Sequence, residues 1–101
     1  MKLSVPIDKE TEKIQENIPD TKYIKLYDIA DNRILCSEIV GTMGCDPEQL
    51  VNIAAMFESD ALICSNIPES LADMMEEEGI YIFSGYSGDS DEAVEKFLQG
   101  K

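Results

Sequence analysis

The chain has 101 residues, 44% of them hydrophobic, and its eight basic and twenty-one acidic residues give a net charge of −13. This length predicts one domain, residues 1–101, with a core large enough to fold without disulfides. The charge argues against nucleic acids and anionic membranes as partners, because both need clustered Lys and Arg. No apolar run is long enough to span a bilayer. The three unevenly spaced cysteines do not form a disulfide framework, so we expect a cytoplasmic protein.

The first residues predict a strand followed by a long polar connection. Residues 2–7 alternate apolar with polar or small side chains, which is typical of a strand and unlike a secretion signal. Pro6 is expected to mark the end of that strand or an edge of the sheet. Residues 8–21 are polar and indicate either a loop or one short helix that ends at Pro19.

A hairpin and a helix are predicted next. Residues 23–29 and 33–40 have the composition of two strands, joined by a tight turn at 30–32 whose Asp and Asn tolerate the left-handed conformation. Asp46 is a good N-cap for a helix that runs to about Glu58. We therefore expect the second and third strands to be antiparallel neighbours.

The second half of the chain predicts strand, helix, strand, helix. Residues 61–64 and 80–83 are short apolar runs of strand length. Between them a helix begins at Pro68 and ends at Gly79, since glycine enters the left-handed cap conformation at low cost. Asp89 begins the last helix, with Glu92 three residues on as in a capping box. Strands that alternate with helices imply parallel strands and right-handed crossovers, so the fold class is α/β.

This topology brings separate loops to one rim of the sheet. If only the second strand opposes the others, the ends of the other four strands share that rim. It then gathers the loops 8–21, 41–45, 64–66 and 84–88. Ligands of open α/β sheets bind at such a rim, and free N–H groups of helix N-termini there suit anions.

Positive charge is concentrated near the first strands. Six of the eight basic residues lie in the first third of the chain, and none occurs between Arg33 and Lys96. An anionic ligand would therefore find positive charge near the N-terminal strands, whereas the rest of the surface indicates an acidic, well-solvated protein.

Five segments of the chain carry a family resemblance: residues 23–29, 61–64, 77–80, 84–88 and 91–101. Together they resemble the nitrogenase iron–molybdenum cofactor biosynthesis domain, the type found in NifX and at the C-terminus of NifB. The resemblance implies a ribonuclease H-like three-layer α/β/α fold with about three helices. Its mixed five-stranded sheet has the order 3-2-1-4-5, with strand 2 antiparallel. It also implies a non-catalytic protein that binds or carries an iron–sulfur-type or iron–molybdenum cofactor precursor, with a protein partner in metal-cofactor assembly.

The chain departs from this family at positions where members often carry histidine or glycine. The family's His-Phe-Gly reads Asn17-Ile18-Pro19 here, its Gly-His-Gly loop reads Met43-Gly44-Cys45, and its two glycines after the fourth strand read Ser65-Asn66. The chain contains no histidine. The resemblance implies cofactor-binding positions at Asn17, Met43, Gly44, Cys45, Ser65, Asn66, Gly85 and Gly88.

Thiols are the remaining candidates for holding a metal cluster. A self-contained iron–sulfur or zinc site takes about four ligands, and the chain has only Cys36, Cys45 and Cys64. A preassembled cluster brings its own sulfides, so fewer protein ligands can hold it. We predict Cys45 as the main ligand, because it precedes a helix N-terminus that favours the thiolate, with Cys64 as the second and Met43 as a soft thioether. Cys36 is predicted to be a small buried residue.

Two functions stay open, and catalysis is not expected. Without histidine there is no Ser/His/Asp or Cys/His arrangement, and Asp8, Asp28 and Asp60 are explained by turns and caps. The first function is a carrier or chaperone for a cofactor precursor, which the rim loops and Cys45 favour. The second is a protein-interaction or regulatory module that kept the fold but lost the cofactor site, which the missing histidines favour.

Overall fold

The computed structural model describes residues 1–16, 18, 21–42 and 47–100. These residues form three helices and six strands, and four of the six strands lie in the first half of the chain. In chain order the elements are β1 (Lys2–Asp8), β2 (Lys13–Ile14), β3 (Tyr23–Ala30), β4 (Arg33–Gly41), α1 (Pro47–Met56), β5 (Ala61–Ile63), α2 (Glu69–Glu77), β6 (Tyr81–Phe83) and α3 (Ser90–Gln99).

The strands form one mixed sheet in the order β4-β3-β1-β5-β6, with β2 attached to the end of β1. β3 runs antiparallel to both β1 and β4, whereas β5 is parallel to β1 and to β6. The predicted mixed sheet, its strand order and its one antiparallel strand among five are therefore confirmed. No helix of the described residues combines the length and apolar character that crossing a membrane requires.

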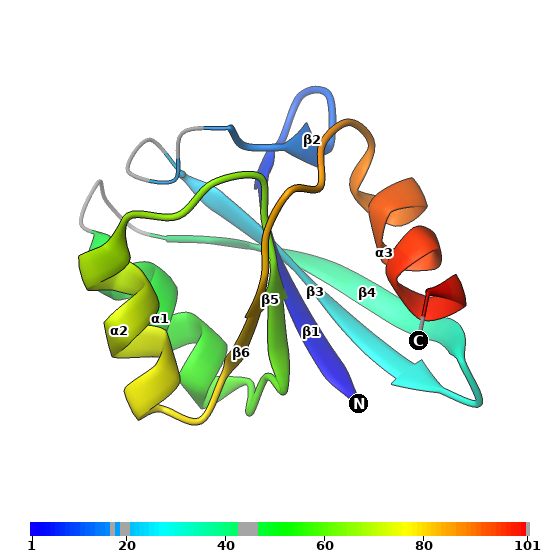
Figure 1. Ribbon diagram of the computed structural model, residues 1–101. Coiled ribbons are helices and arrows are strands. Elements are labelled where there is room, and N and C mark those ends of the chain that lie inside the picture. The colour runs from blue at the N-terminus through cyan, green and yellow to red at the C-terminus, as the bar shows by residue number, and fades with distance from the viewer. Residues whose placement is uncertain (17, 19–20, 43–46, 101) are drawn as a thin grey trace.

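Helices cover both faces of the sheet, which gives the predicted three layers. Figure 1 shows α3 on one face and α1 with α2 on the other. Each face has its own core of buried side chains. The core beneath α3 contains Leu3, Val5, Ile7, Ile14, Tyr27, Ile29, Ala61, Ile63, Ala93, Val94, Phe97 and Leu98. The core beneath α1 and α2 contains Ile18, Ile24, Leu26, Leu50, Val51, Ala54, Leu62, Cys64, Leu71, Met75 and Ile80.

Local sequence signals explain how several elements begin and end. Asp31 and Asn32 both adopt the left-handed conformation, as the predicted hairpin turn requires. Gly79, at φ 78°, follows α2 as predicted. The carboxylate of Asp89 accepts a hydrogen bond from the Glu92 N–H at 3.1 Å, which confirms the predicted N-cap of α3.

Pro6 lies inside β1, so the prediction that it marks a strand end or an edge is wrong. β1 is the central strand, and Pro6 is opposite Ile24 of β3. The Pro6 carbonyl accepts from the Gln15 N–H on the other side of the strand, at 2.9 Å. Nitrogen and carbonyl of a strand residue point to the same side. The missing N–H of Pro6 therefore faces Gln15, beyond the last residue that pairs with β5, so the ladders from β1 to β3 and to β5 stay intact.

The connection after β1 folds back as a strand, which neither sequence alternative included. Glu12 adopts the left-handed conformation, at φ 55°, and its N–H donates to the Asp8 carbonyl. Lys13 and Ile14 then pair with the end of β1. Ile14 is buried beneath α3, and this burial stabilises a strand too short to be visible as a pattern.

Candidate functional site

The loops that follow β5 and β6 meet at one rim of the sheet, as predicted. The Gly85 N–H donates to the Ser65 carbonyl at 2.9 Å, and the Tyr86 N–H donates to the Cys64 carbonyl at 3.1 Å. Two of the predicted binding positions, Ser65 and Gly85, are therefore direct neighbours, and Asn66 follows Ser65. Parallel strands end at the same rim, and this is why loops about twenty residues apart come together.

The connection after β1 reaches the same rim from the other side. The Ile14 N–H of β2 donates to the Gly88 carbonyl at 2.8 Å, and the Ser90 N–H donates to the Glu12 carbonyl at 3.0 Å. Gly88 has φ 82°, a conformation that suits glycine. The predicted position Gly88 is thus held between β2 and the start of α3.

The end of β4 also lies at this rim. Ile7 of β1 pairs with Tyr23, and Tyr23 pairs with Gly41 of β4. The described residues on either side of the loop 43–46 are Thr42, which follows β4, and Pro47, which begins α1. The predicted positions Asn17, Met43, Gly44 and Cys45 lie outside the described residues.

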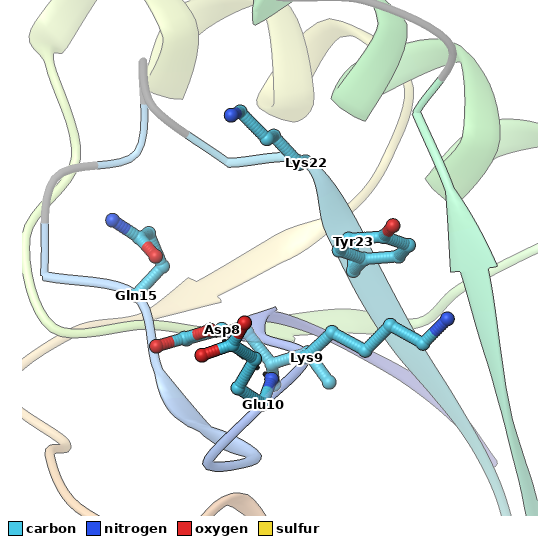
Figure 2. Close-up of a pocket in the computed structure, with 7 residues that line it drawn as sticks. Asp8, Lys9, Glu10, Gln15, Lys22 and Tyr23 are labelled. Carbon is cyan, nitrogen blue, oxygen red and sulfur yellow. Dashed lines mark hydrogen bonds between the residues drawn. The ribbon is translucent and has the colours of Figure 1, made fainter.

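A cavity of about 620 Å³ opens at the rim between the loop after β1 and the start of β3. Figure 2 shows Asp8, Lys9 and Glu10 on one side of it, with Gln15, Lys22 and Tyr23 around the rest. The Lys9 ammonium lies 4.9 Å from the centre of the Tyr23 ring, a cation–π contact that keeps its charge beside the cavity. The sequence did not identify this cavity, although the concentration of basic residues near the first strands is the signal that pointed toward it.

The three acidic residues that the sequence assigns to turns and caps, Asp8, Asp28 and Asp60, do not meet at one site. Asp8, at the rim, accepts from the Glu10 N–H and the Thr11 hydroxyl, at 3.2 and 3.4 Å, and so shapes its own loop. Asp60 accepts from the N–H of Lys2, at the opposite end of β1, and Asp28 pairs with that same residue. Within the described part of the chain, no three His, Cys, Asp or Glu side chains are grouped to hold a metal ion.

A partly buried network of charged and hydroxyl groups connects the rim to the sheet. Lys25 of β3 is 7% exposed, and its ammonium lies 2.7 Å from a Glu12 oxygen and 2.9 Å from an Asp91 oxygen. The neighbouring Tyr27 hydroxyl donates to Ser90 at 3.0 Å and also to the Asp91 carboxylate. β3 thereby holds both the connection after β1 and the first turn of α3.

The network shifts the pKa values of its members in the direction expected for a stable cluster. Burial lowers the pKa of Lys25, but the hydrogen bonds to Glu12 and Asp91 outweigh it and raise the pKa above its usual value. Burial raises the pKa of Asp91, and the hydrogen bonds from Tyr27 and Lys25 bring it below its usual value. Burial and the bond to Asp91 raise the pKa of Tyr27. Lys25 and Asp91 therefore stay charged, and Tyr27 neutral, across the physiological pH range.

The two described cysteines differ in environment and in position. Cys64 is 0% exposed in the core beneath α1 and α2, and burial raises the pKa of its thiol to about 11. A ligand role for Cys64 would require this core to open and the thiol to ionise. Cys36 is exposed, so the prediction that it is buried is wrong. It pairs with Asp28, which pairs with Lys2, and this puts Cys36 toward the end of the sheet away from the rim.

This difference predicts two distinct thiol reactivities. In a Cys45→Ser variant, we expect the Cys36 thiol to react with a disulfide reagent such as DTNB at the rate of an exposed thiol at neutral pH. The Cys64 thiol should react only as fast as the protein opens, because it is buried and protonated. A stopped-flow trace with two phases of equal amplitude would support this assignment. Two fast phases would contradict the buried position of Cys64.

Comparisons with known proteins agree with this architecture. The model of the dinitrogenase iron–molybdenum cofactor family matches residues 1–100. No curated protein matches the sequence. The crystal structure of the PH0822 protein has a TM-score of 0.90 at 17% identity, and the alignment covers 100% of this chain and 93% of that one.

Two further solved structures carry names related to nitrogenase. A protein of Methanocaldococcus jannaschii, provisionally named a dinitrogenase, is 25% identical over 99% of this chain and 89% of its own, with a TM-score of 0.79. A Thermotoga protein provisionally named NifB is 19% identical over 98% of this chain and 88% of its own, with a TM-score of 0.74.

Proposed function

This chain belongs to the dinitrogenase iron–molybdenum cofactor family, and we propose that it is a non-catalytic carrier of an anionic iron–sulfur-type cofactor precursor bound at the rim. The family is linked to the biosynthesis of the iron–molybdenum cofactor. The observation that carries the proposal is the convergence of the loops after β1, β5 and β6 on one rim, beside a cavity that two lysines line.

The distribution of thiols supports Cys45 as the protein's anchor for the cluster. Cys64 is buried in the core, and Cys36 lies away from the rim. Cys45 follows the strand whose end lies at the rim and precedes α1 in sequence. A thiolate before a helix N-terminus is stabilised by the free N–H groups of the first turn. A single thiolate can suffice because the cluster brings its own sulfides.

The other predicted positions would contact the cargo without ligating iron directly. Ser65 and Asn66 offer hydroxyl and amide donors to sulfides, while Gly85 and Gly88 let the backbone approach closely. Met43 and Gly44 precede the anchor in sequence, and the Met43 thioether would be the exception, a soft ligand to the metal. The ammonium groups of Lys9 and Lys22, beside the cavity, would attract the negative charge of the cargo, against the opposing charge of Asp8 and Glu10 in the same lining.

Anaerobic loading with an iron–sulfur cluster donor, followed by desalting, tests the proposal. We expect the wild-type chain to become brown and to retain iron, with thiolate-to-iron absorption in the visible region. Cys45→Ser should lose about tenfold or more of the retained iron. Cys36→Ser is the matched control, because it removes an exposed thiol away from the rim, and it should load like the wild type. Equal loading of wild type and Cys45→Ser would refute the anchor.

The second candidate function, an interaction or regulatory module without cargo, rests on one observation. The chain has no histidine, and its described residues contain no group of three metal-ligating side chains. The same loading experiment separates the two functions. A folded protein that stays colourless and iron-free in every variant would favour the interaction module.

A further inference from the structure

The two edges of the sheet are built differently. β6 at one edge has three residues, whereas β4 at the other edge has nine (Figure 1). Proteins prevent unwanted pairing of an exposed edge by keeping it short, by placing Lys or Pro in it, by a bulge or by covering it. β6 is short, but β4 contains neither Lys nor Pro. Its one irregularity is a bulge opposite Asp28 and Ile29.

Beyond this bulge β4 offers a regular edge for pairing. Residues 36–41 pair one to one with residues 28–23 of β3, and no other described strand pairs with β4. Alternate residues of such a strand direct their N–H and C=O groups outward. Leu35 and Ile39 are 61% and 37% exposed, so apolar side chains accompany the free edge. An edge of this kind is a template for another strand.

The charge distribution favours a second copy of this chain as that strand. Residues 1–42, which contain β1, β3 and β4, carry eight acidic and six basic residues, a net charge of −2. Residues 43–101 carry thirteen acidic and two basic residues, a net charge of −11. Within β4, Arg33 balances Glu38. Two copies that approach through β4 keep α2, β5 and β6 far apart. The acidic α3 contacts β4, so its repulsion stays near the interface, where salt screens it.

We propose that β4 pairs antiparallel with β4 of a second copy across a twofold axis and joins the two sheets into one. This interface is isologous, so each copy contributes the same edge. A register centred on Glu38 puts two carboxylates directly opposite each other and is unfavourable. Registers centred on Ser37 or Ile39 avoid this contact and bring apolar side chains of the two strands together. The interface covers the side chains of Leu35 and Ile39.

Sedimentation equilibrium at several protein concentrations, with a reducing agent to prevent cross-linking through Cys36, tests the proposal. We expect a monomer–dimer equilibrium whose association constant rises between about 0.05 M and about 0.5 M NaCl. Ile39→Lys should lower this constant about tenfold or more, because each copy loses one buried apolar side chain and adds one charge to the interface. Tyr81→Lys, on the opposite edge, makes the same change in net charge and should leave the constant unchanged.

The matched charge change makes the comparison specific. Both substitutions reduce the net negative charge, so weaker association of Ile39→Lys alone cannot come from overall repulsion. Leu35→Ser provides a second variant that preserves charge and should also weaken the dimer. Amide exchange in β4 should slow as protein concentration rises. A chain that stays monomeric under all conditions, or a dimer weakened by Tyr81→Lys and not by Ile39→Lys, overturns the proposal.

Discussion

Leu62→Ala should lower the free energy of unfolding by about 2–5 kcal/mol, the range for a buried leucine truncated to alanine. Leu62 is the middle residue of β5 and is 0% exposed in the core beneath α1 and α2. β1 and β6 flank it, so the surrounding strands cannot collapse into the space that the substitution leaves. The total free energy of unfolding of a domain of this size is about 5–10 kcal/mol, so this one change removes a large part of its stability.

Leu35→Ala is the matched control for this prediction, because the same side chain is truncated at a position that is 61% exposed. We expect a change within about 0.5 kcal/mol. Urea unfolding followed by circular dichroism gives both values, at a protein concentration low enough to avoid association through β4. Similar losses for the two variants would contradict the assignment of Leu62 to a packed core and of Leu35 to a free edge.

The fold could be predicted because its main elements are encoded by short-range patterns. The two apolar runs 61–64 and 80–83, each followed by a helix, imply parallel strands without any knowledge of contacts. Asp31 and Asn32 form the hairpin turn, and Asp89 caps α3 through the Glu92 N–H. Both signals involve residues no more than three apart in the chain. The adjacency of Ser65 and Gly85 followed from the same rule, since parallel strands must end at one rim.

Features that depend on distant partners could not be predicted in this way. The Lys25 ammonium meets Glu12, thirteen residues away, and Asp91, sixty-six residues away. β2 exists because Ile14 fills a place beneath α3, which no local pattern of two residues can indicate. Cys36 was predicted to be buried because it lies in mid-strand, but strand position does not say whether the strand is at an edge. The ligand roles of Cys45 and Cys64 remain predictions.

Lys25→Met should lower the free energy of unfolding by about 1–3 kcal/mol. The substitution keeps the length of the side chain but removes the ammonium, so Glu12 and Asp91 lose their shared partner. Breaking a fully buried ion pair costs about 3–5 kcal/mol. We expect less here, because the Glu12 and Asp91 side chains are 46% and 54% exposed and water partly replaces the lost contact. Lys22→Met, which removes an exposed ammonium at the rim, should change stability by less than about 0.5 kcal/mol.

The difference in free energy of unfolding between wild type and Lys25→Met should depend on pH, and this dependence identifies the network as its cause. The pKa of Asp91 is lowered in the folded protein. Its contribution to folding stability is therefore fully present above the pKa of about 3.9 that it has in the unfolded chain, and is lost as pH falls through its lower folded-state pKa. The pKa values of Lys25 and Tyr27 are raised in the folded protein. Their contributions to folding stability are therefore present below about pH 10, near their pKa values in the unfolded chain, and are lost as pH rises further. The gap between wild type and Lys25→Met should therefore be largest between about pH 5 and about pH 9.

The same variant connects the network to the rim. Because Lys25 holds the connection after β1 against the start of α3, its loss should increase amide exchange at Ile14 and Ser90, whose N–H groups bridge these segments. Amides of β5 should stay protected, since the central strands do not depend on the network. A gap in stability that is constant from about pH 3 to about pH 11, with no change in exchange at the rim, would mean that Lys25 acts through packing alone.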